Sequence, residues 1–478
     1  MPSRVRLDRT RTTPRTPLAA AASRSDRGKS RAAESPATVT RVDTRDGRAS
    51  TALLTDQYEL TMLAAALADG SAHRRCTFEV FARRLPNGRR YGVVAGTGRL
   101  LDALRRFTFG ESELAVIAPF LDPSTVDWLR EFRFTGDIDG YREGELYFPG
   151  SPILSVRGSF AECVVLETLI LSVLNHDSAI AAAAARMVSA AAGRRMIEMG
   201  SRRTHELAAP ACSRAAYLAG FDATSNLAAV REFGIPGAGT SAHAFTLLHS
   251  GADGEHEAEA FRSQVRALGV GTTLLVDTFD ITRGVATAVE VAGAELGGVR
   301  IDSGDLGVLA RQVRDQLDAL GATRTRIVVS GDLDEYAIAA LRAEPVDVYG
   351  VGTSLVIGSG APTAGMVYKL VEVDGIPVAK RSSHKESRGG TKKAVRLARD
   401  TGTIVEEIVY PAAGPAPDAG VFEARELLIP LVRAGAVIDD APSLASGRDL
   451  VAHGLVSLPW EGLKLSAGEP AIPTTFAS

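Results

Sequence analysis

The chain has 478 residues and a mass of 50.3 kDa, enough for two or three domains at the usual size of roughly 150 residues each. Its composition, 45% apolar and 23% charged, is that of an ordinary globular protein with a sizeable core. The net charge of −3 gives no reason to expect nucleic acid or an anionic membrane as the main partner.

The basic charge is concentrated at the N-terminus. Residues 1–50 hold 12 Lys and Arg against 5 Asp and Glu, so the other residues carry 42 against 52. The segment has too few large apolar side chains to offset the entropy of ordering, and we expect a disordered basic tail. Its five acidic residues argue against an organelle transit peptide, and an over-long start of translation is an alternative explanation.

Cysteine usage and hydropathy indicate the compartment. Cys76, Cys163 and Cys212 lie far apart without a CxxC pair, which excludes a disulfide framework or a thiolate zinc site and favours a cytoplasmic protein. The most apolar stretch, residues 161–174, contains two glutamates, and no uninterrupted apolar run reaches the roughly 18 residues that a membrane span needs. We therefore expect a buried helix there and no membrane partner.

The first ordered region, residues 51–150, mixes helices and strands. Thr55 or Asp56 is a plausible N-cap for a helix that runs to about residue 68. Apolar residues alternate over 76–83, which is typical of a strand, and a Pro-Asn-Gly turn follows. This pattern predicts an N-terminal α+β domain. Further strands are expected near 91–95 and within 137–148, with helices near 97–106 and 111–131.

From about residue 150 the chain changes to helices and repeated β/α units. Two helices are expected over 162–175 and 178–192, and the second is nearly all alanine. Short apolar runs then recur at intervals of roughly 20–30 residues, the spacing of β/α units in a parallel sheet. The predicted strands are 273–276, 298–301, 326–329 and 346–349, and the predicted helices are 282–293, 306–320 and 334–343.

Polar clusters follow the ends of these four strands in turn. Because the working groups of α/β barrels gather at that position, we predict an irregular TIM-like α/β barrel core over residues 151–360. An open doubly wound sheet would obey the same rule and is an alternative. Residues 361–478 form a small C-terminal region. Its first part, 361–400, contains an apparent hairpin at Asp374-Gly375 that we expect to join the N-terminal domain.

The strand ends carry the residue types that bind a sugar phosphate and Mg²⁺. Carboxylates supply hard oxygen ligands for Mg²⁺ or for ribose hydroxyls, and backbone N–H groups of glycine turns bind phosphate oxygens. Asp302-Ser-Gly-Asp305 has both features, although an N-cap followed by a turn explains the same residues. Ser330-Gly-Asp332 and Gly350-Val-Gly-Thr353 are equally compatible with plain turns. Three such clusters on successive strands favour a binding site.

Two further motifs carry cationic or titratable side chains. Gly200-Ser-Arg-Arg203 sets two arginines beside a turn, which suits bidentate phosphate binding, although adjacent arginines are also common at a solvated helix end. His243 lies six residues after Gly237, and for a single histidine a structural role is the commoner interpretation. The eight histidines include no HExxH pair and no zinc-ligand spacing.

As a set, these motifs resemble those of nicotinate phosphoribosyltransferases, which are type II phosphoribosyltransferases. Their order and spacing match over about residues 51–400, and they are specific together but not singly. The motifs that carry the resemblance are Thr55-Asp-Gln-Tyr58-Glu-Leu-Thr-Met62, Gly200-Ser-Arg-Arg203, Ala223-Thr-Ser-Asn226, Gly239-Thr-Ser-Ala-His243, Asp277-Thr-Phe-Asp280, Arg300-Ile-Asp-Ser-Gly-Asp305, Ser330-Gly-Asp332 and Gly350-Val-Gly-Thr353.

The resemblance implies an ATP-assisted step of NAD salvage. Nicotinate and 5-phosphoribosyl-1-pyrophosphate would give nicotinate mononucleotide and pyrophosphate, with ATP as co-substrate and Mg²⁺ as cofactor. His243 resembles the family's transiently phosphorylated histidine, and Asp277 resembles the acid that orients it. Asp302 and Asp305 resemble binders of ribose, pyrophosphate and Mg²⁺, and Asp302 is the third implied catalytic residue.

The other implied residues bind substrate. Gly331, Asp332, Gly352 and Thr353 resemble a cradle for the 5-phosphate. Tyr58 resembles the aromatic residue that stacks on the pyridine ring across a dimer interface, so the resemblance implies a homodimer with shared active sites. The remaining substrate contacts implied by the resemblance are Arg202, Thr224, Ser225, Arg300 and Ser303, with Arg202 on a phosphate or on the nicotinate carboxylate.

The residue types agree with this chemistry. Displacement at an anomeric carbon develops positive charge on the ribose, so a catalyst needs anionic oxygens near the ring and cations around the departing pyrophosphate. The aspartates at the strand ends and the arginines supply both. The pyridine nitrogen is itself the nucleophile, so no general base is needed.

Two positions bear on the substrate. Met199 stands where family members often have an aromatic residue, so one wall of the pyridine pocket departs from the family pattern. Nicotinamide-specific relatives carry Asp where Ser225 aligns, and a hydroxyl there suits a carboxylate that an Asp would repel. The alternatives are a nicotinamide phosphoribosyltransferase, an enzyme for quinolinate or another acid, and a phosphosugar-binding barrel without activity, in which His243 and Asp277 would have no use.

Overall fold

The structure is a computed structural model that describes residues 48–249, 256–380, 387–438 and 443–477. All of these residues belong to one compact unit. The basic tail expected over residues 1–50 lies outside the described residues, apart from its last three positions.

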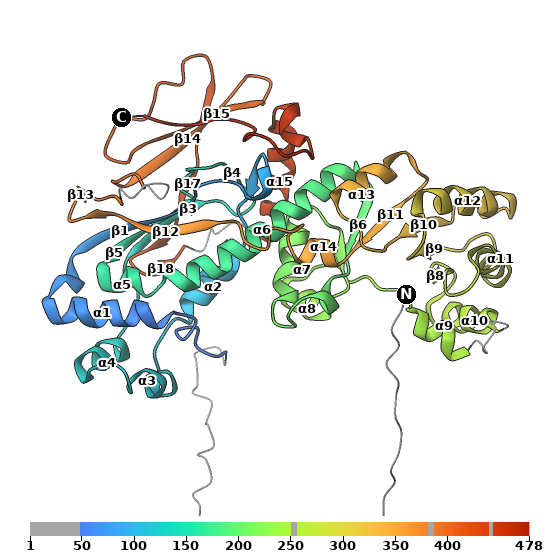
Figure 1. Cartoon of the computed structure of the whole chain (residues 1–478), viewed down its shortest axis with the longest axis horizontal. Helices are drawn as coiled ribbons and strands as arrows, with labels where there is room; N and C mark the ends of the chain where they lie inside the picture. The colour runs from blue at the N-terminus through green and yellow to red at the C-terminus, as the bar shows by residue number, and fades with distance from the viewer. Residues whose placement is uncertain (1–47, 250–255, 381–386, 439–442, 478) are drawn as a thin grey trace, which may run out of the picture. The chain divides into compact units, whose positions relative to one another are not determined.

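The N-terminal region is built on an antiparallel sheet. Its strand order is β13-β12-β1-β5-β3-β17-β18, and each neighbouring pair runs antiparallel (Figure 1). Strands far apart in the sequence therefore lie side by side in one sheet. The bounds are β1 (Arg75–Ala82), β3 (Asp137–Tyr141), β5 (Leu154–Ser159), β12 (Met366–Val373), β13 (Ile376–Pro377), β17 (Leu428–Arg433) and β18 (Ala436–Val437).

The helices of this region share one hydrophobic core with the sheet. Leu60, Phe78, Val156 and Tyr368 are all buried in it, and the rings of Phe78 and Tyr368 stack with centroids 4.8 Å apart. The helices are α1 (Gln57–Asp69), α2 (Thr97–Arg105), α3 (Glu111–Ile117), α4 (Pro123–Arg130) and α5 (Phe160–Val164), beside the short paired strands β2 (Gly92–Val93) and β4 (Leu146–Tyr147) and the 3₁₀ turns η1 (Ser71–His73) and η2 (Pro86–Gly88).

Most predicted elements of this region are confirmed, with one division that the sequence pattern missed. The stretch 111–131, predicted as a single helix, is α3 followed by α4. The carboxylate of Asp122 starts the second helix, because it accepts hydrogen bonds from the N–H groups of Ser124 and Thr125 at 3.0 Å each, and Pro123 follows at the first helical position. The predicted hairpin is β12 and β13.

One long helix, α6 (Glu167–Ala191), takes the place of the two helices predicted around residues 176–177. His176 and Asp177 do not break it, because the buried Asp177 carboxylate accepts hydrogen bonds from Arg99 of α2 at 2.8 and 2.9 Å. The stretch Phe160–Ala191 contains an 18-residue window with a mean hydropathy of 1.4, which is long and apolar enough to cross a membrane. However, 67% of that window is buried inside the protein, as in the core helix of a globular domain.

The second region is a parallel sheet that curls into a half-barrel, which confirms the predicted TIM-like α/β core. Its order is β7-β6-β11-β10-β9-β8, with β7 and β8 as the edges of the described sheet. Figure 1 shows β6, β11, β10, β9 and β8 in succession. The bounds are β6 (Arg195–Glu198), β7 (Ala223–Thr224), β8 (Thr273–Leu275), β9 (Gly298–Ile301), β10 (Arg326–Val329) and β11 (Val348–Val351).

Strand β11 begins two residues later than predicted. Gly350 and Val351 pair with Ile197 and Glu198 of β6, so Gly350 belongs to the strand and not to the turn after it. The helices predicted after β8, β9 and β10 are confirmed. The helices of this region are α7 (Ala209–Leu218), α8 (Leu227–Phe233), α9 (His243–His249), α10 (Glu257–Leu268), α11 (Ile281–Ala292), α12 (Leu306–Ala319), α13 (Glu335–Ala340), continued by η4 (Leu341–Ala343), and α14 (Thr353–Val356).

The C-terminal region adds a small sheet of its own, in the order β16-β14-β15-β19. A buried arginine ties it to the N-terminal region: Arg396 of β14 donates to Glu407 of β15 at 2.6 Å and also to Glu145, which precedes β4. Removing one partner of such a pair would leave a buried charge uncompensated. The bounds are β14 (Lys392–Ala398), β15 (Ile404–Pro411), β16 (Glu423–Glu426), β19 (Thr474–Phe476), α15 (Leu444–Ser457) and η5 (Trp460–Leu463).

Candidate active site at the ends of the parallel strands

The polar motifs of the sequence meet along one edge of the half-barrel. Because the strands run parallel, their carboxyl ends lie at the same edge of the sheet. The segments that follow the strands there are 199–203 after β6, 225–226 after β7, 276–280 after β8, 302–305 after β9, 330–332 after β10 and 352–353 after β11.

Asp302 is held by two neighbours at the end of β9. Arg300 donates to its Oδ1 at 2.9 Å and to the Ser330 hydroxyl at 2.8 Å, and that hydroxyl donates to the same Oδ1. Burial alone would raise the pKa of Asp302, but the Ser330 hydrogen bond and the charge of Arg300 hold this pKa below its usual value. Asp302 is therefore an anion at neutral pH.

Asp277 links the end of β8 to the end of β9. Its Oδ2 accepts hydrogen bonds from the backbone N–H of Asp302 at 2.7 Å and from the Ser303 hydroxyl at 3.0 Å. The side chain is 1% exposed, and its Oδ1 has no hydrogen-bond partner among the described residues. A buried carboxylate oxygen without a donor is costly, so this atom is a ready acceptor for a proton donor that comes close.

His243, the first residue of α9, faces both carboxylates. Its Nε2 lies 4.0 Å from Asp277 Oδ1 and 4.0 Å from Asp302 Oδ2, while its Nδ1 lies 3.1 Å from the Thr278 hydroxyl. The side chain is 42% exposed, so part of the ring is open to a ligand. The structure thus brings together His243, Asp277 and Asp302.

The turn after β10 fits closely against the end of β9. Gly331 has a φ of +116°, and a Cβ at this position would lie 2.4 Å from the carbonyl oxygen of Asp302. Glycine meets both demands, since it has no Cβ and adopts positive φ without strain. Asp332 follows with a φ of 47°, again in the left-handed region.

Asp305 and Thr353 lie at the starts of helices. Asp305 caps α12, because its Oδ1 accepts a hydrogen bond from the backbone N–H of Val308 at 3.2 Å. The N-cap interpretation of the sequence is therefore correct, and it leaves the second carboxylate oxygen available. Thr353 is the first residue of α14, directly after Gly352.

Two turns at the β7 side of the sheet carry Arg202 and Ser225, and both side chains are exposed. Thr224 differs, because it is buried and its hydroxyl lies 2.5 Å from a carboxylate oxygen of Glu198. Two of these three predicted contacts thus reach the surface, and the third faces the interior.

Met199 packs against the end of β11. A Cβ at Gly350 would lie 2.8 Å from the Met199 sulfur and 3.3 Å from Cβ of Ser330. The thioether thus fills the space that Gly350 leaves, beside the serine that holds Arg300 and Asp302. A flexible and polarizable side chain suits such a position.

Tyr58 is not part of this cluster. It lies on α1, whose buried residues belong to the first hydrophobic core, whereas the strands β8 to β11 belong to the second. The side chain is 46% exposed. Burial, and then the charges of Glu167 and Glu59, raise the pKa of Tyr58 to about 12, so its ring stays neutral at physiological pH.

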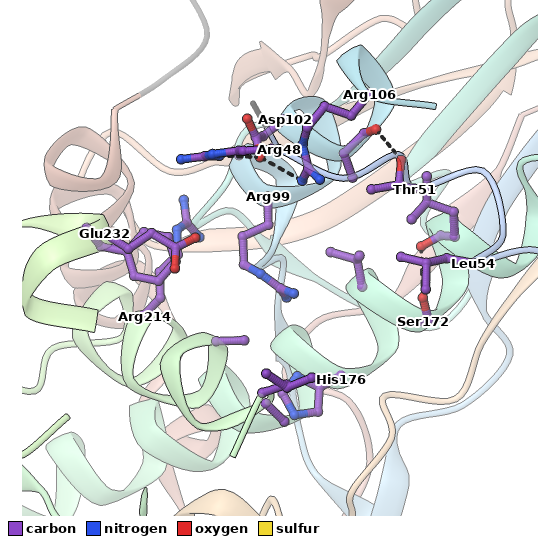
Figure 2. A pocket seen from close by; sticks show the side chains of 18 of the residues that line it. Arg48, Thr51, Leu54, Arg99, Asp102, Arg106, Ser172, His176, Arg214 and Glu232 are labelled. Atoms are coloured by element: carbon purple, nitrogen blue, oxygen red, sulfur yellow. Dashed lines mark hydrogen bonds and ion pairs between the residues drawn. The ribbon is translucent and has the colours of Figure 1, made fainter. Parts of the chain in front are cut away.

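A cavity of about 750 Å³ lies beside α2, α6 and α7, and none of the strand-end residues named above lines it. Figure 2 shows Arg99 reaching into its middle, with Arg214 and Glu232 on one side and Thr51 and Leu54 on the other. Each of its four arginines pairs with a carboxylate, and two of them share one. The pairs are Arg48 and Arg106 with Asp102, Arg99 with Asp177, and Arg214 with Glu143.

Three polar residues of this region have no role predicted from the sequence: Glu198, Asn226 and Thr278. Glu198 had a usable signal, because it is the one acid in the apolar run Met196-Ile-Glu-Met199 at the end of a strand. A charged residue in such a run must be buried with partners or point into a site. Asn226 and Thr278 had no comparable signal.

Two family models match the chain. One is described as the nicotinate phosphoribosyltransferase (NAPRTase) N-terminal domain and matches residues 53–175. The other is described as the nicotinate phosphoribosyltransferase (NAPRTase) family and matches residues 194–403. The second range contains His243 and the strand ends described above.

Relatives and solved structures agree with these matches. The chain is 70% identical over 442 residues to nicotinate phosphoribosyltransferase pncB1 of Mycobacterium tuberculosis, covering 92% of this chain and 98% of that protein. It is 37% identical over 366 residues to the nicotinate phosphoribosyltransferase of Bacillus subtilis, covering 73% of each. The crystal structure of human nicotinic acid phosphoribosyltransferase matches with a TM-score of 0.77 and 28% identity, over 89% of this chain and 98% of that one. The nicotinate-nucleotide pyrophosphorylase of Pyrococcus furiosus shares the fold, with a TM-score of 0.72 and 24% identity over 88% and 98% of the two chains.

Proposed function

The chain belongs to the nicotinate phosphoribosyltransferase family, and from this premise we propose that it makes nicotinate mononucleotide with the help of ATP, as a step of NAD salvage. The pyridine nitrogen attacks the anomeric carbon of 5-phosphoribosyl-1-pyrophosphate, and the bond from that carbon to pyrophosphate breaks. Pyrophosphate leaves with the electron pair, while ATP is hydrolysed alongside to ADP and phosphate. The observation that supports this most is the position of His243 Nε2, 4.0 Å from both Asp277 and Asp302.

His243 is the residue that we expect ATP to phosphorylate. Oδ1 of Asp277 is buried, has no hydrogen-bond partner among the residues that the structure describes, and faces the ring, so it can accept the proton of one ring nitrogen. The other nitrogen then keeps its lone pair for the γ-phosphorus of ATP. The N–P bond forms as the bond to ADP breaks, and water later cleaves the N–P bond to release phosphate and free histidine.

The end of β9 is the proposed binding place for ribose and pyrophosphate. Asp302 is ionised and can stabilise the positive charge that develops on the ribose, and Arg300 both holds Asp302 and offers positive charge to the leaving group. Ser303 and Asp305 follow on the same turn and complete these contacts. The 5-phosphate would lie on the next two turns, at Gly331, Asp332, Gly352 and Thr353.

Mg²⁺ is the proposed cofactor, bound together with the phosphates of the substrates. Among the described residues no cluster of three or more His, Cys, Asp or Glu side chains could hold a metal ion alone. Asp302 uses one oxygen for Arg300 and Ser330, and Asp305 uses one to cap α12, which leaves one oxygen of each. This fits an ion held mainly by phosphates with one or two carboxylates, as Mg²⁺ prefers. When bound, the ion would neutralise charge on the departing pyrophosphate.

The nicotinate carboxylate is proposed to bind Arg202 and Ser225. The buried Thr224 would not contact it directly but would hold the turn that carries Ser225 in place. Tyr58 would stack on the pyridine ring from the second subunit of a homodimer. Exposed apolar side chains close in sequence to Tyr58, Arg202 and Ser225 support a homodimer interface, because a second copy of the chain would cover them. These are Leu54 at 56%, Leu207 at 80% and Leu227 at 79% exposure.

The proposed location is the cytoplasm. The three cysteines are buried and unpaired, which agrees with a reducing compartment.

Purified protein with ATP, Mg²⁺, 5-phosphoribosyl-1-pyrophosphate and either nicotinate or nicotinamide tests the proposal. We expect nicotinate mononucleotide, with ADP formed alongside, as measured by chromatography. A higher kcat/KM for nicotinamide would mean a nicotinamide phosphoribosyltransferase, and substrate binding without any product would mean a phosphosugar-binding protein. Product formation without ATP consumption would remove the phosphohistidine step.

A further inference from the structure

A buried carboxylate that has no role so far lies at the end of β6. Glu198 is 1% exposed, and both of its carboxylate oxygens have partners. One accepts a hydrogen bond from the backbone N–H of Gly200, and the other lies 2.8 Å from the Ser213 hydroxyl and 2.5 Å from the Thr224 hydroxyl. Its carbonyl oxygen accepts a hydrogen bond from the N–H of Ser225 at 2.9 Å. One residue thus contacts the turn after β6, helix α7 and the turn after β7.

Asn226 links the buried Thr224 to Ser201, nearer the surface. Its backbone N–H donates to the Thr224 hydroxyl at 2.9 Å, and its side-chain amide donates to the Ser201 hydroxyl at 3.0 Å. Its amide oxygen caps α8. Glu198, Thr224, Asn226 and Ser201, which we call the Glu198 network, therefore connect the two turns by an unbroken series of hydrogen bonds.

We propose that Glu198 is a positioning residue that fixes the spacing of Arg202 and Ser225 and thereby makes the site select a carboxylate on the pyridine ring; this rests on the proposed function. Arg202 and Ser225 are both exposed, so side-chain packing does not hold them in place. Their positions depend on the backbone of the two turns, and the Glu198 network joins those turns. Exposed binding groups need such a rigid support to keep the geometry that recognises a ligand.

The chemistry of the network requires a carboxylate at Glu198. The Gly200 N–H can only donate, and the Thr224 hydroxyl already accepts from Asn226, so it is best satisfied by donating to Glu198. A carboxylate accepts from both sides at once. A glutamine must keep its oxygen toward Gly200 and turn its NH₂ toward Thr224 and Ser213, so the two hydroxyls that now donate to Glu198 must turn their protons elsewhere. We expect this rearrangement to loosen the β7 turn.

Steady-state kinetics of Glu198→Gln test this. We expect the KM for nicotinate to rise about tenfold or more, because misplaced binding groups lose affinity steeply, while kcat and the KM for 5-phosphoribosyl-1-pyrophosphate change by less than about threefold. Glu143→Gln is the matched control, because Glu143 is 2% exposed and binds Arg214 and the N–H groups of Gly96 and Gly98 away from these turns. It should lower the melting temperature without the selective change in KM. An equal rise in the KM for nicotinate in both variants, or no rise in Glu198→Gln, overturns the proposal.

A double-mutant cycle of Glu198→Gln with Asn226→Ser distinguishes a loss of positioning of Arg202 and Ser225 from a general loosening of the protein. Serine can still cap α8 but cannot reach Ser201, so this variant cuts the network near the surface. If both residues act through one network, the double variant raises the KM for nicotinate little more than the stronger single variant. A rise equal to the product of the two single effects contradicts a shared network.

Failure of the proposed function and failure of the proposed role of Glu198 give different results. Wild-type protein that makes no nicotinate mononucleotide refutes the proposed function, whereas active wild-type protein with an unaffected Glu198→Gln variant refutes only the role of Glu198. If Glu198→Gln does not fold, Asn226→Ser alone tests the proposal. An unchanged KM for nicotinate in Asn226→Ser then overturns the positioning role.

Discussion

Nε2 of His243 and Oδ1 of Asp277 lie 4.0 Å apart, and that oxygen is buried without a hydrogen-bond partner in the described part of the chain. The distance is about 1 Å longer than a hydrogen bond, so the ring must move toward the carboxylate to form one. Since Oδ2 of Asp277 is already bound to the end of β9, Oδ1 is the oxygen left to decide which ring nitrogen carries the proton.

Asp277→Asn should lower kcat by at least about a hundredfold, as expected when an essential imidazole is held in the wrong tautomer. The amide oxygen must stay toward the N–H of Asp302, so the NH₂ would face His243 and reverse its tautomer preference. The measurements are kcat and acid-labile labelling by γ-labelled ATP. Asp280→Asn, at the exposed N-cap of α11, is the control and should keep both. Retained label in Asp277→Asn would contradict the orienting role.

Arg300→Met should move the acid limb of kcat/KM for 5-phosphoribosyl-1-pyrophosphate to higher pH. Arg300 helps to hold the pKa of Asp302 below its usual value, so its removal raises that pKa and the active carboxylate is lost earlier on acidification. In wild-type protein the ionised Asp302 also stabilises the fold above its unfolded pKa, and this is lost only as the pH falls through the lower folded value. Arg326→Met, on the exposed start of β10, should leave the profile unchanged. Identical acid limbs in all three proteins would exclude Asp302 from the rate-determining chemistry.

Gly331→Ala should destabilise the protein by about 1–3 kcal/mol and raise the KM for 5-phosphoribosyl-1-pyrophosphate. The added Cβ would lie 2.4 Å from the carbonyl oxygen of Asp302, in addition to the strain of a φ of +116°. Gly321→Ala separates the two effects, because Gly321 has a φ of +80° and nothing within 4 Å of its Cβ position. Urea unfolding and steady-state kinetics provide the comparison, and equal losses in the two variants would mean that backbone strain alone matters.

Ser225→Asp should lower kcat/KM for nicotinate by about a hundredfold or more and improve the use of nicotinamide. The new carboxylate repels the nicotinate carboxylate and accepts a hydrogen bond from an amide NH₂. Ser225→Ala, which removes the hydroxyl without adding charge, should reduce activity with nicotinate far less. If Ser225→Asp keeps the wild-type ratio of the two substrates, Ser225 does not face the pyridine substituent.

Glu257→Gln should make the protein more stable at pH 8 by on the order of 1–2 kcal/mol. Burial raises the pKa of Glu257 to about 7, opposed by the charge of Arg283 and assisted by that of Asp280. Between about pH 4.5 and 7 the folded state therefore keeps a proton that the unfolded state has lost, so stability falls as the pH rises through this window. Urea unfolding at pH 5.5 and pH 8 measures the effect. Glu259→Gln, with a side chain 61% exposed on the same helix, should keep the wild-type slope.

The strand ends could be predicted because they depend on local patterns. Asp277 and Asp302 directly follow a short apolar run, Gly331 follows one after Ser330, and parallel pairing then places all three at one edge of the sheet. The role of Glu198 could not be predicted, because its partners Ser213 and Thr224 lie 15 and 26 residues away on other elements.

Two errors in secondary structure have the same origin. The sequence pattern suggested separate helices around His176 and Asp177, yet Arg99 from a distant helix satisfies the buried aspartate within α6. The start of β11 was misplaced because its register depends on pairing with β6, about 150 residues earlier. In both cases a tertiary partner outweighs the local signal.

The antiparallel sheet also constrains how the protein can be synthesised. Strands β1, β5 and β3 leave the ribosome first, but β1 pairs on its other side with β12 and β3 with β17, and both late strands come after the whole half-barrel. The nascent three-stranded sheet has two open edges until β12 has emerged at Val373, and its β3 edge stays open until β17 has emerged at Arg433. Open strand edges are the kind of surface on which chains aggregate. The half-barrel can therefore complete its pairing on the ribosome before the N-terminal sheet does, although it is translated later.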